Sequence, residues 1–134
     1  MYSNLVQSKK PVLLSIIELG GYPDFSRLYR DNGYDVVTTD SVRKAVKLIR
    51  QHKPAVIVAE FNFQSDFRDR TSSLETVFSS LQGVADANVI VFYEKEYLHQ
   101  FDRLRSQFEV FESLEFPIND AALDLALKAA KPLT

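Results

Sequence analysis

Short apolar runs alternate with amphipathic segments along most of the chain. The runs, rich in β-branched residues, predict strands at residues 11–17, 34–39, 55–59, 88–92 and 109–114. After each run, apolar residues recur at helical spacing, which predicts helices that begin near Pro23, at Asp40 or Ser41, at Thr71 or Ser72, near Tyr97 and at Asn119. Strict strand–helix alternation predicts an α/β domain, a doubly wound parallel sheet with helices on both faces.

The third run has a distinct place in this scheme. Residues 55–59 read Ala-Val-Ile-Val-Ala, so this strand is apolar on both faces and belongs in the centre of a covered sheet. Glu60 stands at its carboxyl end. The fifth run alternates enough to be an edge strand.

Composition limits the classes of function. The 134 residues fit a lead-in of residues 1–10 and one domain of residues 11–131. A net charge of −2 supplies no basic field for nucleic acid, and no apolar run approaches a membrane span. The absence of cysteine removes disulfides, thiolate metal sites and cysteine nucleophiles. We therefore expect a cytoplasmic protein that contacts neither nucleic acid nor membrane.

Three segments resemble receiver domains of response regulators, the CheY-like family. Residues 32–60, NGYDVVTTDSVRKAVKLIRQHKPAVIVAE, resemble that family's second strand, second helix and third strand. VIVFY at 89–93 resembles the fourth strand, and EFPI at 115–118 resembles the segment after the fifth. The resemblance covers about residues 11–130, and it implies a flavodoxin-like sheet with strand order 2-1-3-4-5.

The same resemblance assigns the positions of aspartyl phosphorylation, and most of them have changed. Glu60 stands at the phosphoacceptor position, and Ile17 and Glu18 stand where the family carries its acidic pair. Tyr93 replaces the Thr or Ser that binds the phosphoryl group, and Phe116 replaces the Lys that offsets its charge. The resemblance therefore implies a degenerate pseudo-receiver without catalytic residues, cofactor or metal.

Glu60 has two interpretations. It could imitate a phosphorylated aspartate permanently, or it could be a solvated carboxylate at the mouth of the sheet. We favour the second, because Tyr93 and Phe116 leave no group that would respond to the charge. Glu18 and Glu60 together would bind Mg²⁺ only weakly, so no functional metal is expected.

Residues 61–70, FNFQSDFRDR, mix aromatic and charged side chains in a stretch that looks longer than in typical receivers. Its aromatic side chains either plug the vacated phosphorylation pocket together with Tyr93 and Phe116, or form a contact for a partner. The two interpretations stay open and are compatible. The candidate partner-binding residues are Phe63, Phe67, Arg68 and Arg70, with Tyr97 and Arg105 from the fourth helix.

These patterns predict a stand-alone, phosphorylation-independent interaction module of bacterial signal transduction that is not an enzyme. The expected partner is a histidine kinase, another regulator or a second copy of the chain. A homodimer would use the face of the fourth helix, fifth strand and fifth helix, which offers Tyr97, Arg103, Arg105, Glu109, Glu112, Asp124 and Lys128.

Two alternatives remain. One is a small-ligand or enzymatic domain that uses the crevice at the carboxyl ends of the strands, with Glu18 and Glu60 as acid–base carboxylates. The other is a receiver with residual, atypical phosphorylation.

Overall fold

The structure, a computed structural model, describes residues 10–18, 21–62 and 73–132. Its strands are β1 (Val12–Ile16), β2 (Asp35–Thr39), β3 (Val56–Glu60), β4 (Asn88–Tyr93) and β5 (Glu112–Glu115). Its helices are α1 (Ser26–Asp31), α2 (Val42–His52), α3 (Ser73–Leu81), α4 (Leu98–Gln107) and α5 (Asp120–Ala130), with a 3₁₀ turn η1 (Lys95–Tyr97) before α4. The predicted order of elements is confirmed.

The five strands form one parallel sheet in the order β2-β1-β3-β4-β5. All five residues of β3 are buried, as expected for a central strand with helices on both sides. The strands β2 and β5 form the two edges of the sheet. The predicted fold class and strand order are therefore confirmed.

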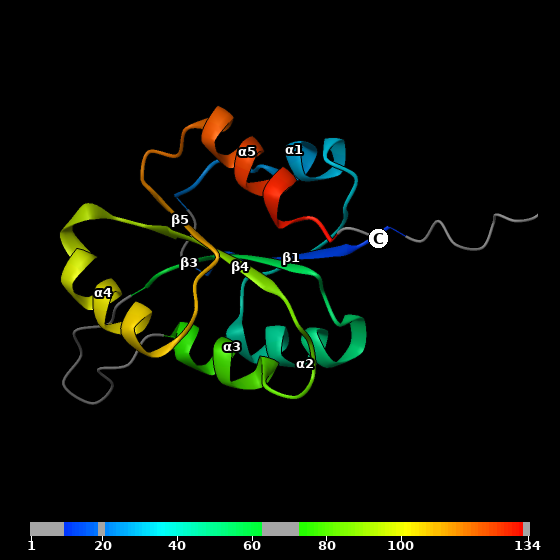
Figure 1. The fold of residues 1–134 in the computed structure, drawn as a ribbon, viewed down its shortest axis with the longest axis horizontal. Helices are drawn as coiled ribbons and strands as arrows, with labels where there is room; N and C mark the ends of the chain where they lie inside the picture. Colours follow the sequence, from blue (N-terminus) through cyan, green and yellow to red (C-terminus); the bar gives the residue numbers. More distant parts are fainter. Residues whose placement is uncertain (1–9, 19–20, 63–72, 133–134) are drawn as a thin grey trace, which may run out of the picture.

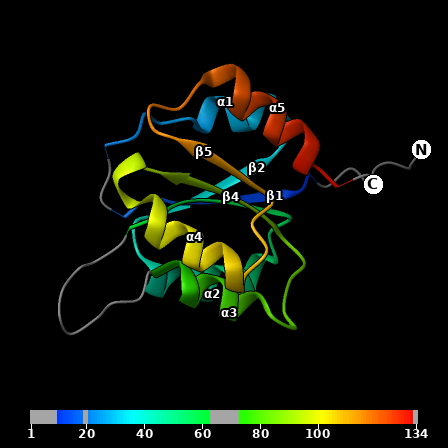
Figure 2. The same cartoon turned by 60° about the vertical axis from the view of Figure 1, so that its left-hand side comes forward.

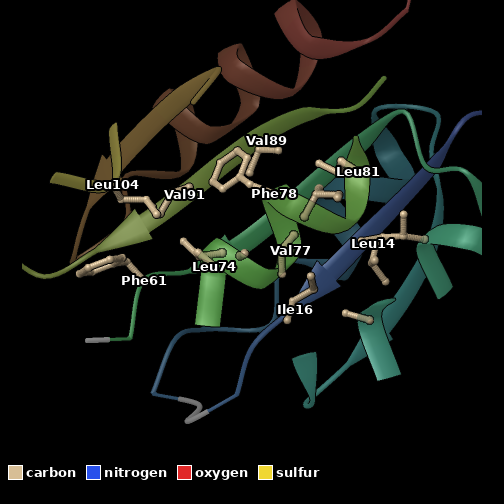
Figure 3. Close-up of a cluster of buried hydrophobic side chains, with 14 of the residues drawn as sticks. Leu14, Ile16, Phe61, Leu74, Val77, Phe78, Leu81, Val89, Val91 and Leu104 are labelled. Atoms are coloured by element: carbon tan, nitrogen blue, oxygen red, sulfur yellow. The ribbon is translucent and has the colours of Figure 1, made fainter. Parts of the chain in front are cut away.

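Helices cover both faces of the sheet (Figure 1). The helices α1 and α5 lie on one face, and α2, α3 and α4 lie on the other, as the turned view in Figure 2 also shows. Each face has its own apolar cluster: Figure 3 draws the one under α2, α3 and α4, where Val77 of α3 lies beside Ile16 of β1 and Phe78 lies beside Val89 of β4. The apolar positions predicted for the third helix, Leu74, Val77, Phe78 and Leu81, are all buried.

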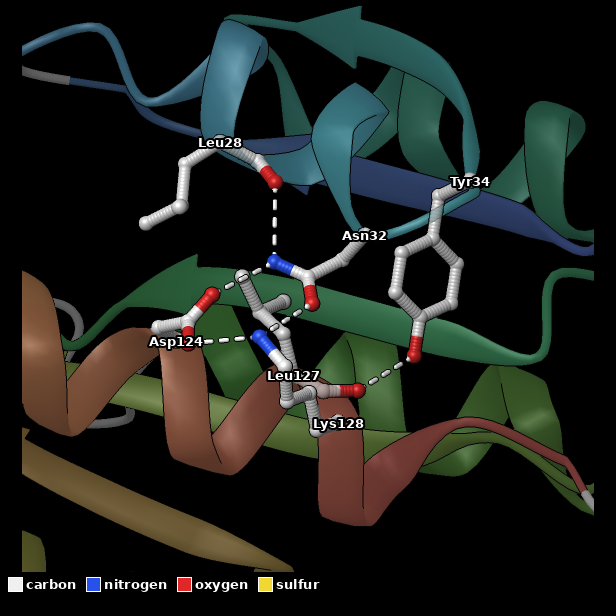
Figure 4. A network of polar contacts seen from close by, with 6 residues as sticks. All are labelled: Leu28, Asn32, Tyr34, Asp124, Leu127 and Lys128. Atoms are coloured by element: carbon white, nitrogen blue, oxygen red, sulfur yellow. Dashed lines mark hydrogen bonds and ion pairs between the residues drawn. The ribbon is translucent and has the colours of Figure 1, made fainter.

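A network of polar contacts joins α1 to α5 (Figure 4). The Asn32 amide nitrogen donates to the Leu28 carbonyl at 3.0 Å and to Asp124 Oδ1 at 2.9 Å. Lys128 Nζ donates to Asn32 Oδ1 at 3.1 Å and to Asp124 Oδ2 at 2.6 Å. We call Asn32, Tyr34, Asp124, Leu127 and Lys128 the α1–α5 seam. Asp124 and Lys128, which were nominated for the α4–β5–α5 face, both contact Asn32 at the end of α1, and their part in a dimer stays a prediction.

Tyr34 is the buried part of this seam. Its side chain is 1% exposed, and its hydroxyl donates to the Leu127 carbonyl at 2.7 Å. A buried hydroxyl costs free energy unless it is hydrogen-bonded, so this bond fixes the start of β2 against α5.

Two element boundaries differ from the predictions. The first helix begins at Ser26 rather than near Pro23, because Asp24 Oδ1 accepts from the Ser26 N–H in a turn before the helix. The fifth strand covers 112–115 rather than 109–114. Phe108 stacks on Phe78 of α3 with ring centroids 5.0 Å apart, so the preceding residues are used to return from α4 to the sheet.

The lengths of the helices decide whether any of them could span a membrane. The longest helices in the described ranges, α2 and α5, have 11 residues each, about half of what a bilayer span requires.

Candidate functional site

The carboxyl ends of β1 and β3 bring Glu18 and Glu60 to one place. The two strands are neighbours, with Ile16 paired to Ala59, and the two glutamates follow within two residues of that pair. The Asn62 amide nitrogen donates to Glu60 Oε1 at 3.0 Å and to Glu18 Oε1 at 3.3 Å. The predicted proximity of the two carboxylates is confirmed, and Asn62, which the sequence analysis did not single out, bridges them.

Glu60 is buried. Its side chain is 5% exposed in the last position of β3. The favoured interpretation, a solvated carboxylate at the mouth of the sheet, is therefore wrong. A buried carboxylate requires hydrogen-bond partners, and Asn62 is one of them.

Tyr22 covers this site from the segment before α1. Its ring lies 5.3 Å from that of Phe92 and 5.2 Å from that of Phe116, the second contact edge-on at 87°. Burial raises the pKa of the Tyr22 phenol, and the carboxylates of Glu94 and Glu60 raise it further. The phenol therefore stays neutral, and its ring joins Phe92 to Phe116 at the carboxyl end of the sheet, a contact that the sequence analysis missed.

Phe116 follows β5 directly. Its backbone N–H donates to the Tyr93 carbonyl at 2.8 Å, which fixes it beside the carboxyl end of β4. The side chain is 41% exposed and contacts Tyr22. The interpretation in which Phe116 plugs the vacated pocket together with the 61–70 stretch stays a prediction, because residues 63–70 lie outside the described residues. Phe116 forms part of the surface at the carboxyl end of the sheet.

Tyr93, the last residue of β4, packs toward α4 instead. Its ring stacks on Phe101 at 4.9 Å, and its hydroxyl lies 3.5 Å from Glu115 Oε1. Burial and the Glu115 carboxylate raise the pKa of Tyr93. Arg105 lies over Phe101, the ring on which Tyr93 stacks, with its guanidinium carbon 4.8 Å from the Phe101 ring centroid. The position of the family's Thr or Ser is thus built into an aromatic stack on α4.

The remaining nominated residues are placed only in part. Phe61, the first residue of the 61–70 stretch, is buried and packs 5.4 Å from Phe101. Tyr97 is half-buried against the same cluster, and Arg105 is exposed and paired with Asp102. Four nominated residues, Phe63, Phe67, Arg68 and Arg70, lie outside the described residues.

The residues at this site do not suit a divalent cation. No group of three or more His, Asp or Glu side chains in the described ranges is arranged to hold a metal. Between Glu18 and Glu60, the nearest described side chain presents a hydrogen-bond donor, the Asn62 amide nitrogen, where Mg²⁺ would require oxygen ligands. We therefore assign no step to a metal.

Comparison with solved structures identifies the fold. A chemotaxis protein of Vibrio cholerae, CheY4, superposes with a TM-score of 0.71 at 17% identity, covering 91% of this chain and 99% of its own. A response regulator receiver domain protein from Clostridium thermocellum gives 0.69 at 15% identity, covering 89% and 93%. The receiver domain of a putative LuxO repressor protein from Vibrio parahaemolyticus gives 0.64 at 20% identity, covering 91% and 93%.

The chain therefore has the CheY-like receiver fold over most of its length. No model of a known protein family matches the sequence, and no curated protein matches it either.

Proposed function

We propose that this chain is a receiver-fold module of bacterial signal transduction that acts by binding another protein and does not depend on phosphorylation. Its structural neighbours are named as receiver domains and a chemotaxis protein, which supports the signalling setting. The partner is a kinase, another regulator or a second copy of the chain, and the cytoplasm is the compartment in which such partners meet.

The observation that carries phosphorylation independence is Phe116. The residue after β5 is the one that the resemblance aligns with the family's Lys, and here a phenyl ring takes that place and contacts Tyr22. An apolar ring supplies no charge to offset a phosphoryl group. Glu60 also has one methylene more than Asp, which displaces its carboxylate from the position in which an Asp would attack a phosphoryl group.

A binding role is supported over acid–base catalysis at the same site. A general acid or base must reach the proton that it transfers. Glu18 and Glu60 both accept from Asn62, and Tyr22 lies over Glu60. These contacts hold the carboxylates in place without a substrate.

The α4–β5–α5 region offers the surface for a partner. Figure 2 shows β5 between α4 and α5 at one edge of the sheet. All large hydrophobic side chains found exposed in the described residues belong to this region, namely Leu98, Phe111, Phe116 and Leu125. Leu125 is the most open at 68% exposure, on the side of α5 away from the core. Exposed apolar side chains concentrated in one region are typical of interaction surfaces.

Self-association tests the surface directly. We expect sedimentation velocity over a roughly hundredfold range of concentration to show a reversible dimer. Leu125→Glu places a charge in the apolar surface, and it should weaken the dimer by about tenfold or more. The control Gln51→Glu adds the same charge to the exposed side of α2 and should leave the dimer unchanged.

Two outcomes would count against this assignment. A monomer at every concentration would exclude the second copy as partner, and equal weakening by both substitutions would place the dimer contact elsewhere. Circular dichroism of both variants shows that the fold is retained.

A further inference from the structure

A cavity of about 800 Å³ opens beside the carboxyl end of the edge strand β2. Its walls come from the segment before α1, from Thr38 and Thr39, and from α2, and neither Glu18 nor Glu60 lines it. The volume lies within the range of small-molecule sites, about 300 to 1,000 Å³. The cavity exists because α1 has only six residues and begins at Ser26, so it covers little of the sheet near the end of β2.

One wall of the cavity is aromatic. Tyr22, Phe25 and Phe92 all line it, and the first two pack on the third with ring centroids 5.3 and 5.8 Å away. Phe92 is 1% exposed, so the wall rests on the buried centre of the sheet. Fixed rings of this kind provide an apolar surface for a flat ligand at little cost in conformational entropy.

The opposite wall is cationic. Lys44 and Lys47 of α2 line the cavity, and both are exposed. Residues 42–53 contain no acidic residue, and no salt bridge involving these lysines occurs within the described parts of the chain. The ammonium groups are therefore available to a negative ligand.

The acidic residues of the cavity do not cancel this preference. Asp24 Oδ1 accepts from the Ser26 N–H at 2.9 Å, so this carboxylate is held in the turn before α1. Asp40 is exposed and precedes the amino end of α2, whose dipole favours its charge. The long lysine side chains, by contrast, are free to reorient toward a ligand.

We propose that this cavity binds a small aromatic anion: a flat ring system against Tyr22 and Phe25, with its carboxylate, sulfonate or phosphate contacted by Lys44 and Lys47. The site lies beside β2, at the edge of the sheet opposite β5. The substitutions that test the two proposals lie on different elements, Lys44 and Lys47 on α2 and Leu125 on α5, so each proposal can fail without the other.

The test is an NMR titration of the full ¹⁵N-labelled chain with 2-naphthoate. A ligand of this size is expected to bind with a Kd on the order of 1 mM. Amide shifts should concentrate at Thr38, Thr39, Lys44 and Lys47. The neutral analogue 2-naphthamide should bind roughly tenfold more weakly, because it lacks the charge-assisted contacts. Inorganic phosphate, which lacks the ring, should bind more weakly still.

Matched variants of α2 separate the cavity from general surface charge. Lys44→Gln with Lys47→Gln should weaken 2-naphthoate binding roughly tenfold or more. Arg43→Gln with Arg50→Gln removes the same charge from the same helix at residues that do not line the cavity, and should change Kd less than about twofold. All of these positions are exposed, so the fold is expected to persist.

Four results would each overturn the proposal. One is the absence of shifts up to about 10 mM 2-naphthoate, tenfold above the expected Kd. Another is a set of shifts centred away from the end of β2. The last two are equal weakening by the two double substitutions and equal binding of the neutral analogue, since either would show that Lys44 and Lys47 do not hold the anionic group.

Discussion

The α1–α5 seam and the carboxyl end of the sheet are both organised around an asparagine side chain, but its partners differ. In the seam, the Asn32 amide donates to the Asp124 carboxylate and accepts from the Lys128 ammonium, which also donates to Asp124. Asn32 is therefore paired with one negative and one positive group. At the carboxyl end, Asn62 donates to two carboxylates, Glu18 and Glu60. The seam thus joins two helices through groups of opposite charge, whereas at the carboxyl end two groups of the same charge share the Asn62 donor.

This difference separates structural from functional parts of the molecule. Balanced polar contacts that join elements far apart in sequence stabilise the fold, and their loss should lower stability. A cluster of like charges at the ends of parallel strands does not serve packing in the same way. It occupies the edge of the sheet where α/β proteins place their functional groups. Substitutions in the two regions should therefore have unequal effects.

Tyr34→Ala should have the largest effect on stability. The side chain is 1% exposed, so its loss leaves a cavity between β2 and α5 as well as an unpaired Leu127 carbonyl. We expect the free energy of unfolding to fall by about 3 to 5 kcal/mol. Urea denaturation followed by circular dichroism measures this free energy. A loss below about 1 kcal/mol would show that the Tyr34 contacts of the seam do not stabilise the fold.

Tyr34→Phe isolates the hydrogen bond of the same residue. The ring remains and only the donation to the Leu127 carbonyl is lost, so we expect about 1 kcal/mol. Burial raises the pKa of Tyr34 to about 12, so the variant should also lose one phenol that ionises late in an ultraviolet titration. If the phenol that disappears is instead one that ionises near the ordinary value of 10.0, the burial of this hydroxyl is contradicted.

Phe116→Ala should have a smaller effect. The side chain is 41% exposed and makes an edge-on contact with Tyr22, so the loss should be about 0.5 kcal/mol. Phe116→Lys should also fold, because the head group can extend into solvent. A loss as large as that of Tyr34→Ala would show that Phe116 serves the fold and not the surface.

Of these substitutions, Asp124→Asn should lower the free energy of unfolding least, and the size of the loss should depend on pH. Hydrogen bonds from Lys128 and Asn32 lower the pKa of Asp124 below its ordinary value of 3.8. A depressed pKa stabilises the fold above the unfolded-state value, and this contribution is lost as pH falls through the folded-state value. The stability difference between wild type and variant should thus be constant near neutral pH and shrink below pH 3.8. A difference that grows toward acid would contradict this.

Much of the fold was accessible from the sequence because the apolar pattern is regular. The central strand is apolar throughout, and the caps at Ser41 and Asn119 are present, each side chain accepting from the backbone N–H three residues on. The boundaries of α1 and β5 were not predicted correctly. The start of α1 depends on the turn at Asp24, and that of β5 on the contact of Phe108 with Phe78, a residue far away in the sequence that a local pattern does not contain.

The sequence predicted which residues lie at the site, but not the burial and the contacts of their side chains. Glu18 and Glu60 lie together as expected, because both follow neighbouring parallel strands. Asn62 could have been found, since residues two apart in an extended segment point to the same side, and it follows Glu60 by two. Tyr22 left no such signal. Its position over Glu60 depends on how residues 21–25 cross the end of the sheet.

Phosphorylation independence is the central claim, and intact-mass measurement tests it most directly. The chain is incubated with acetyl phosphate and Mg²⁺, beside a variant that carries Ile17→Asp, Glu60→Asp, Tyr93→Thr and Phe116→Lys together. We predict that the wild-type mass stays unchanged while the variant gains one phosphoryl group that hydroxylamine removes, as expected of an aspartyl phosphate. A phosphoryl group on wild-type Glu60, lost in Glu60→Gln, would contradict the account.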